Sequence, residues 1–145
     1  MSISEIAHVN IVVSNMEQSI KFYRDLLNFK IILDKEISSP ELSKGVGLEN
    51  VHARVTIFKL SEGNALLELF EYKNPAGKNA GINPPNTIPL NHIAFKVKKI
   101  KPYYESLKRR GVEFVSEPQT IADGVSFCYF RDPDGALLEL IEFPE

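Results

Sequence analysis

The sequence predicts an α+β fold built from two successive modules, each with the order strand, helix and three further strands (βαβββ). The main observation is an octet that occurs twice, as residues 65–72 (ALLELFEY) and 136–143 (ALLELIEF), identical at six of eight positions. A second correspondence lies upstream of each copy, where a histidine-bearing strand leads into a helix. Such self-similarity indicates one structural unit used twice. We expect one domain over residues 1–145, with modules at about 4–73 and 91–144 and a linker at about 74–90.

Each module opens on an expected strand, residues 7–13 (AHVNIVV) and 91–97 (NHIAFKV), whose β-branched and aromatic residues recur at a period of two. Because strand side chains alternate between faces, each opening strand has one helix-packed face and one opposite face. His8 and His92 hold the same place in the two repeats and lie on the opposite face. They share that face with Asn10 and Val12 in the first module, and with Ala94 and Lys96 in the second.

A helix is expected directly after each opening strand. The first begins near Ser14, with Glu17 completing a capping box, and ends at Asn28. The second has Pro102 near its first turn and ends at Gly111. Apolar residues at helical spacing form one face of each helix: Met16, Ile20, Tyr23 and Leu27 in the first, and Ile100, Tyr103 and Leu107 in the second.

Three more strands are expected after each helix: residues 29–33, 55–60 and 65–72 in the first module, and 112–115, 126–130 and 136–143 in the second. Residues 38–50 are expected to form a loop, as are residues 73–90, which contain four prolines. The turn at residues 132–135 (DPDG) has ordinary hairpin chemistry and says nothing about function.

The two octets place glutamates on both faces of their strands. Glu68 and Glu139 share a face with apolar neighbours, where a carboxylate is costly unless something compensates it. Glu71 and Glu142 point the other way and lie near the strand ends, where we expect water to solvate them.

The four residues His8, Glu68, His92 and Glu139 are the candidate metal ligands. Taken alone, a strand histidine is most often structural, and a strand glutamate usually pairs with a cation or lines a solvated face. The repeat, however, yields two of each at equivalent positions. Two imidazoles and two carboxylates form a mixed nitrogen and oxygen ligand set that suits one divalent ion of Zn, Ni, Co, Mn or Fe.

Composition excludes several other classes of function. A net charge of −2 provides no basic field for nucleic acid, and the basic clusters at residues 96–99 and 108–110 are expected to form a solvated surface beside the second helix. No apolar run approaches the roughly 20 residues of a membrane span, and no basic region precedes the first apolar stretch. Cys128, the single cysteine, lies in an apolar run and is expected to pack in the core. We therefore expect a cytoplasmic protein.

Four stretches resemble the vicinal oxygen chelate superfamily of glyoxalase I, methylmalonyl-CoA epimerase, bleomycin-resistance proteins and extradiol dioxygenases: AHVNIVVSNMEQSIKFYRDLL, ALLELFEY, NHIAFKV and FRDPDGALLELIEF. The resemblance spans nearly the whole chain. It implies that the two modules form a curled, mixed-sheet cup around one divalent metal ion. The implied ligands are His8, Glu68, His92 and Glu139, and the implied assembly is a homodimer.

The implied chemistry is that of a glyoxalase I-like lyase or isomerase acting on a small-molecule substrate with vicinal oxygens. A proton next to a carbonyl is removed through a metal-stabilised enediolate. Glu139 is the first choice for the base and Glu68 the second. Val12 and Tyr72 stand where bacterial-type glyoxalase I carries its glutathione-binding Arg and Asn, which argues against glutathione as the carrier.

Three alternatives stay open. A methylmalonyl-CoA epimerase-like isomerase typically has Gln at the position of Glu68 and a further Glu on the preceding strand, where residues 53–58 have no carboxylate. An extradiol dioxygenase-like oxidoreductase matches Tyr129 to its catalytic tyrosine, although strand packing is the more common role for such a residue. A drug- or metabolite-binding protein of the bleomycin-resistance type generally lacks the four ligands. Lys96 is a further candidate contact for an anionic substrate, although an exposed lysine is the ordinary interpretation.

Overall fold

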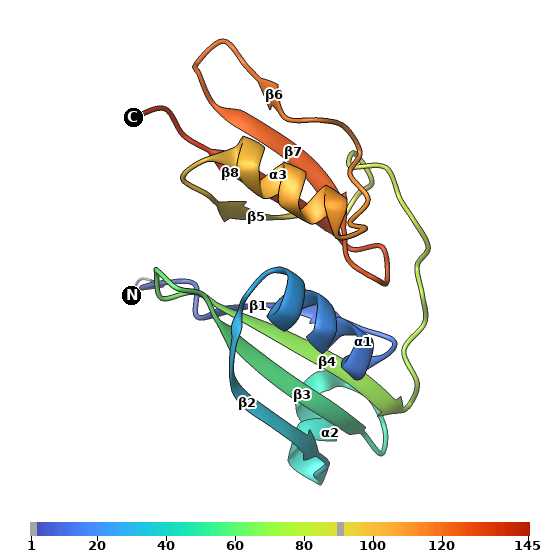
Figure 1. The fold of residues 1–145 in the computed structure, drawn as a ribbon. Helices are drawn as coiled ribbons and strands as arrows, with labels where there is room; N and C mark the ends of the chain where they lie inside the picture. The colour runs from blue at the N-terminus through green and yellow to red at the C-terminus, as the bar shows by residue number, and fades with distance from the viewer. Residues whose placement is uncertain (1–2, 90–91) are drawn as a thin grey trace. The chain divides into compact units, whose positions relative to one another are not determined.

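Each half of the chain forms one mixed four-stranded sheet with a helix across one face (Figure 1). The computed structural model describes residues 3–89 and 92–145, and the chain divides into two units, Met1–Asn79 and Ala80–Glu145. The division falls within the expected linker. Leu90, the expected end of that linker, and Asn91, the expected start of the second opening strand, lie outside the described residues. The sheets and few helices confirm the α+β class and the repeated module order.

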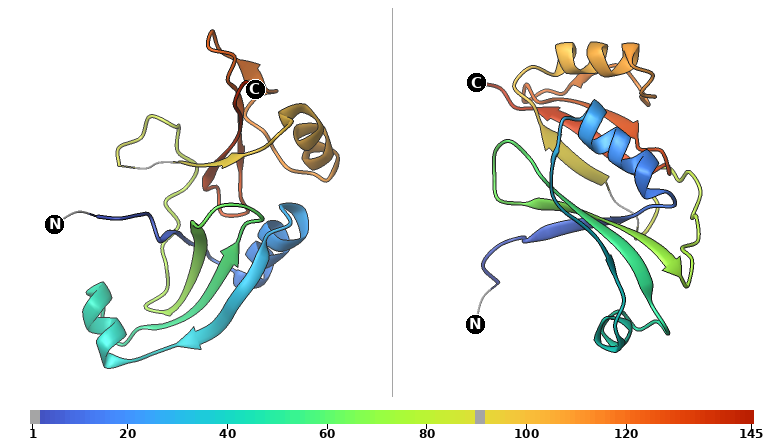
Figure 2. Two further views of the ribbon diagram at one scale, coloured as in Figure 1. Left: turned by 90° about the vertical axis from the view of Figure 1, so that its left-hand side faces the viewer. Right: turned by 60° about the horizontal axis from the view of Figure 1, so that its bottom comes forward.

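The first unit contains β1 (His8–Val12), α1 (Met16–Ile20), the π-helix η1 (Lys21–Leu26), β2 (Lys30–Ile37), α2 (Pro40–Val46), β3 (His52–Lys59) and β4 (Leu66–Asn74). Its strands lie in the order β1-β4-β3-β2. The first and last strands of the module are neighbours and run parallel, whereas the other pairs are antiparallel. Helix α1 covers one face of this sheet, and α2 lies beyond the end of β2, away from α1 (Figure 2).

The second unit repeats this arrangement with β5 (His92–Lys96), α3 (Ile100–Arg109), β6 (Gln119–Thr120), β7 (Ser126–Arg131) and β8 (Leu137–Glu142). The strand order is β5-β8-β7-β6, and β5 again runs parallel to β8. None of the helices within residues 3–89 and 92–145 is long and apolar enough to cross a membrane.

The core of each unit lies between its helix and the facing side of its sheet. Buried side chains in the first unit include Met16, Ile20, Tyr23, Phe58 and Leu69, and in the second Ile100, Leu107, Phe130, Leu138 and Leu140. The expected inward position of Tyr103 is wrong, because this side chain is 51% exposed. Its neighbour Tyr104 packs instead, with its ring edge against Phe114 at 4.7 Å.

The helix ends follow the expected chemistry with one shift of register. The cap of α1 is Asn15 and not Ser14, since the Asn15 side chain accepts a hydrogen bond from the backbone N–H of Gln18. Asn28 has a φ of 61° and Gly111 a φ of 87°, so both take the left-handed conformation in which helices commonly end.

Glu71 and Glu142 cap the two module helices, which corrects the expectation that water solvates them. Glu71 Oε2 accepts a hydrogen bond of 3.0 Å from the backbone N–H of Met16, the first residue of α1. Glu142 Oε2 accepts one of 2.6 Å from the N–H of Ile100, the first residue of α3. A carboxylate at a helix N-terminus satisfies an otherwise unpaired donor and interacts favourably with the helix dipole. In both modules the equivalent glutamate therefore joins the helix to the last strand.

Two expected segments differ from the structure. Residues 38–50 are not all loop, because α2 occupies Pro40–Val46 between an N-cap at Ser39 and a left-handed C-cap at Gly47. Ser followed by Pro is a helix-start signal that a general loop assignment overlooks. Residues 112–115 do not form a full strand. Only an isolated bridge joins Phe114 to Phe130, and the paired edge strand is β6.

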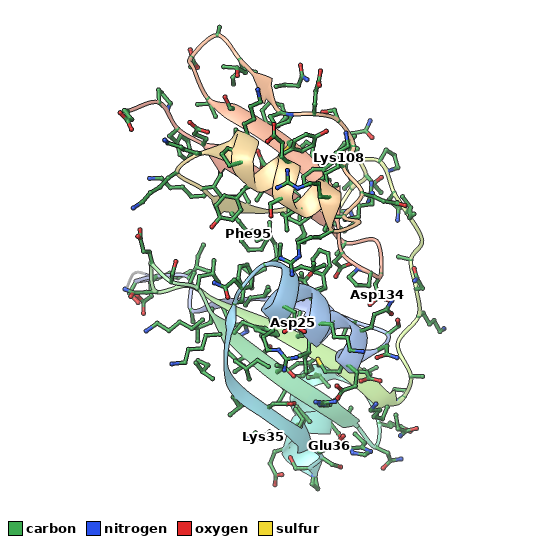
Figure 3. The ribbon with its side chains drawn as sticks, in the orientation of Figure 1. Asp25, Lys35, Glu36, Phe95, Lys108 and Asp134 are labelled. Carbon is green, nitrogen blue, oxygen red and sulfur yellow. The ribbon has the colours of Figure 1, made fainter. Side chains whose placement is uncertain are left out.

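The turn between β7 and β8 has the expected hairpin form. Asp132 Oδ1 accepts hydrogen bonds from the backbone N–H groups of Asp134, which Figure 3 labels, and Ala136. Gly135 adopts a φ of 91°. Arg131 donates to the carbonyl oxygens of Gly135 and Asn83, and so ties the linker to this turn.

A polar network crosses the helix-facing side of the first sheet. Arg54 forms a bidentate pair with Asp34 at 2.8 and 2.7 Å and also binds Glu17 of α1. The buried Thr56 hydroxyl donates to the same Asp34 carboxylate. The hydrogen bond from Arg54 lowers the pKa of Asp34, and burial opposes this shift.

Replacing either capping glutamate should destabilise its module. We expect Glu71→Ala and Glu142→Ala each to lower the free energy of unfolding by about 1 kcal/mol, because a helix N-terminal donor loses its acceptor. Glu71→Gln and Glu142→Gln keep an acceptor oxygen and should lose less. Urea denaturation followed by circular dichroism measures the differences. Equal losses for the Ala and Gln variants would contradict a capping role.

Acid should weaken the contribution of Asp34. Because folding lowers its pKa, the ionised carboxylate stabilises the fold above the unfolded-state pKa of about 3.9, and this contribution is lost as pH falls through the folded-state value. We expect Asp34→Asn to cost about 1 kcal/mol at pH 7 and much less at pH 2. Asp25→Asn, at an exposed pair with Arg24, is the matched control and should change little in urea unfolding (Figure 3). A pH-independent cost at Asp34 would contradict this prediction.

Candidate metal centre

The first unit brings His8 and Glu68 together on the sheet face opposite α1. Residues 8 and 10 of β1 stand opposite residues 66 and 68 of β4, and partners in register share a face of the sheet. His8 Nε2 lies 3.6 Å from Glu68 Oε1. The Glu68 side chain is 16% exposed, whereas His8 is half exposed. The parallel pairing of β1 with β4 thus produces a paired imidazole and carboxylate.

The second unit brings His92 and Glu139 together in the same way. The register of β5 on β8 sets His92 opposite Leu137 and Ala94 opposite Glu139. His92 Nε2 lies 2.8 Å from Glu139 Oε2, and the Glu139 side chain is only 9% exposed. Glu139 is among the few charged residues buried within the described part of the chain.

Both pairs have a chemistry and spacing that fit two ligands of one cation. Donors that each lie about 2.0–2.2 Å from a metal are separated by about 3.0–3.5 Å at octahedral and tetrahedral bond angles. The observed separations of 3.6 and 2.8 Å are close to this range. Within residues 3–89 and 92–145 no three His, Cys, Asp or Glu side chains form one metal-binding group. Each unit thus supplies two donors, and the set of four stays a prediction.

Asn10 is the site-face residue that sequence reasoning did not single out. It stands directly opposite Glu68, and its Nδ2 donates a hydrogen bond of 3.0 Å to Glu68 Oε1. The signal was available as a position two residues after His8 on the same strand face. It gains meaning only when β1 is known to pair in parallel with β4, because that register selects residue 10 as the neighbour of Glu68.

Tyr129 shares the Glu139 face of the second sheet. It stands opposite Glu139, and its ring meets His92 edge to face at 5.0 Å and Phe127 at 5.7 Å. Burial, followed by the charge of Glu139, raises the pKa of its phenol. Tyr129 packs as expected for a strand aromatic, but its partner is a candidate ligand and not the helix-facing core.

The other candidate residues are not part of either pair. Lys96 is exposed, and its Nζ lies 5.6 Å from the centre of the Phe143 ring. Cys128 is 1% exposed and faces the core, as expected. Burial raises the pKa of its thiol to about 12, with a smaller contribution from Glu139, so the nucleophilic thiolate is scarce at neutral pH.

Comparison with known proteins identifies the same fold family. The family model of the Glyoxalase/Bleomycin resistance protein/Dioxygenase superfamily matches residues 5–140. A probable lactoylglutathione lyase from Synechocystis is 29% identical over 136 residues, which cover 93% of this chain and 92% of that protein.

Solved structures share the architecture at low sequence identity. A glyoxalase family protein from Bacillus cereus superposes with a TM-score of 0.86 at 20% identity, covering 98% of this chain and 95% of that one. TnmS3, an antibiotic-binding protein from Streptomyces, superposes with a TM-score of 0.68 at 19% identity, covering 99% of both chains. At these identities the likeness establishes the fold and not the activity.

Cys128 should be unreactive in the folded protein. We expect a thiol reagent such as 5,5′-dithiobis(2-nitrobenzoate) to modify it slowly at pH 8 and rapidly in 8 M urea, where the thiol recovers its ordinary pKa. Absorbance at 412 nm follows the reaction. Equal rates in the two conditions would contradict the buried position.

Proposed function

We propose that this chain, which belongs to the Glyoxalase/Bleomycin resistance protein/Dioxygenase superfamily, is a metal-dependent enzyme that removes a proton next to a carbonyl group. The observation that supports this most directly is the matched pair of His and Glu in each unit, with donor atoms 3.6 and 2.8 Å apart. The repeated fold provides the same pair of ligand types twice, which a chance surface contact would not do.

In this proposal His8, Glu68, His92 and Glu139 hold one divalent cation. The imidazoles supply neutral nitrogen donors, and the carboxylates supply anionic oxygens. The bound ion would act as a Lewis acid that stabilises negative charge developing on vicinal oxygens of a small-molecule substrate. The proposal requires the two units to share the ion, and the assembly that we propose for the active enzyme is a homodimer.

Glu139 is the proposed base. It takes the proton from the carbon next to the carbonyl, and the electron pair of the broken C–H bond moves toward the carbonyl oxygen. The proton then returns to the former carbonyl carbon, and the hydroxyl proton of the first carbon passes to the other oxygen, so that a new carbonyl forms and no atom is lost. Low exposure of the Glu139 carboxylate supports this role, because a base shielded from bulk water keeps the proton until it returns it. Glu68 is the second candidate.

The residues around the two pairs favour some substrates of the superfamily over others. The Synechocystis relative is named a probable lactoylglutathione lyase, which supports a glyoxalase-like reaction. However, Val12 lies half exposed on the His8 face, and Tyr72 lies on the Glu68 face with its ring 5.7 Å from Phe70. Val12 offers no polar group and Tyr72 only a neutral phenol to the charged ends of a glutathione carrier, so we propose a carrier other than glutathione.

A second candidate function is the binding of a small molecule without catalysis. The aromatic rings of Phe127 and Tyr129 on the Glu139 face favour it, because planar ligands stack on such rings. TnmS3, which shares the fold, is described as an antibiotic-binding protein. The His and Glu pairs are not needed for that function, so metal uptake separates the two proposals.

The first experiment measures metal content. We expect about one divalent ion per chain in protein purified without chelators or a His-tag, because four ligands on one chain form one site. His8→Ala, Glu68→Ala, His92→Ala and Glu139→Ala should each lose or weaken binding by inductively coupled plasma mass spectrometry. His52→Ala is the matched control, since His52 pairs with Glu36 outside the proposed site and should keep the ion.

A metal-loaded wild type should then be screened on hemithioacetals, acyl-CoA epimers and catechols, which represent the glyoxalase-like, epimerase-like and dioxygenase-like alternatives. If the wild type takes up no divalent ion even after reconstitution, the enzyme proposal is wrong. A metal-free binding protein is then the better description.

A further inference from the structure

We infer that Asn10 is a positioning residue that holds Glu68 as the stationary carboxylate of the site and leaves Glu139 as the carboxylate that moves. This inference rests on the proposed function, and it concerns a difference between the two modules. The repeat makes the ligands equivalent, whereas the residues that flank them are not.

The contact that carries the inference is the hydrogen bond of 3.0 Å from Asn10 Nδ2 to Glu68 Oε1. A carboxylate only accepts, so the NH₂ end of the amide must face Glu68. Because Asn10 and Glu68 are partners in the β1–β4 register, the backbone fixes both ends of this contact. Oε1 retains one lone pair and Oε2 retains both, so the group can still bind a cation.

The second module has no such amide. Ala94 stands opposite Glu139, in the place that Asn10 holds opposite Glu68. A methyl group can neither donate a hydrogen bond nor orient a carboxylate. The Glu139 carboxylate pairs instead with His92, whose Nε2 is itself a candidate metal ligand.

The residues on the other side of the two glutamates also differ between the modules. On the neighbouring antiparallel strand, Ile57 stands opposite Glu68 and Tyr129 stands opposite Glu139. The Tyr129 ring packs edge to face on the His92 ring, with the two ring centres 5.0 Å apart, and so restrains the imidazole. In the first module a neighbouring side chain therefore orients the carboxylate, Glu68, and in the second a neighbouring side chain orients the imidazole, His92.

This difference between the two carboxylates suits a reaction in which one carboxylate must leave its resting position to reach a substrate carbon. A glutamate held by an amide donor is a poor mobile base, because its movement breaks a charge-assisted hydrogen bond. Glu139 lies 2.8 Å from His92 Nε2, but in the proposed site this nitrogen would bind the ion and would no longer donate to Glu139, so Glu139 would have no amide donor to hold it. Residues behind metal ligands typically change metal affinity by about 10- to 100-fold when they are removed.

The test measures Co²⁺ affinity by competition with a chromophoric chelator, together with the visible absorption of bound Co²⁺. We expect Asn10→Ala to bind Co²⁺ about 10- to 100-fold more weakly and to change the Co²⁺ spectrum, because Glu68 is no longer oriented. The melting temperature of the metal-free protein should fall only slightly, because Asn10 is exposed. Asn10→Gln keeps an amide and should restore part of the affinity. Val12→Ala, at an exposed residue on the same face of the same strand, should bind as the wild type does.

The outcomes separate the two proposals. If the wild type binds Co²⁺ and Asn10→Ala binds it equally well, the positioning role is wrong and the metal site stands. A fall in melting temperature without a change in Co²⁺ affinity also overturns the inference, because Asn10 is then structural only. If the wild type binds no Co²⁺, the proposed function itself is wrong, and the inference is wrong with it.

Discussion

The parallel pairing of the first and last strands of each module is the constraint on which the candidate site depends. Two strands joined by a tight hairpin are antiparallel, so a parallel pair requires a crossover, here through a helix. The crossover makes β4 the neighbour of β1 and β8 the neighbour of β5. The histidine of the opening strand and the glutamate of the closing strand then share one face, although they lie far apart in the sequence. No additional loop or domain is needed to build either pair.

The closing strand serves both faces of its sheet through a single spacing. The glutamates at positions 68 and 71 are three positions apart, which is an odd spacing, and so are those at 139 and 142. Side-chain alternation therefore sends one to the site face and the other to the helix face. The first joins the histidine, and the second accepts from the helix N-terminus. This explains why both glutamates recur in the octet, since losing either one removes a distinct contact.

The sequence was sufficient to predict the modules and the faces of the four ligands, because both follow from repeat and alternation. It was insufficient where one local choice competes with another. Adjacent cap residues Ser14 and Asn15 are both good N-caps, and only the backbone conformation selects Asn15. Residues 112–115 read as a strand by composition, but they form only a bridge to Phe130. The helix at Pro40–Val46 has no buried residue, so burial imposes no periodic apolar pattern on its sequence.

Contacts between distant residues were the least predictable part of the site. The capping role of Glu71 and the hydrogen bond from Asn10 to Glu68 both depend on pairs separated by more than fifty positions. Composition and periodicity carry no information about such pairs until the register is known. Asn10 consequently had no distinguishing signal beyond its place on the His8 face, although it is the neighbour that distinguishes one glutamate from the other.

Charge balance supports the cation that we propose for this fold. Each sheet carries a carboxylate that is 16% or 9% exposed, and the side chain beside it is an imidazole. Burying a carboxylate without a compensating charge is costly. A lysine or arginine carries a single positive charge, as Arg54 does beside Asp34 and Glu17 on the other face, and therefore cannot neutralise two carboxylates. One divalent ion would instead balance both glutamates while the two neutral imidazoles complete its ligands. The proposed shared ion requires a matching pair of imidazole and carboxylate in each unit. Two separate monovalent partners would place no such requirement on the two pairs.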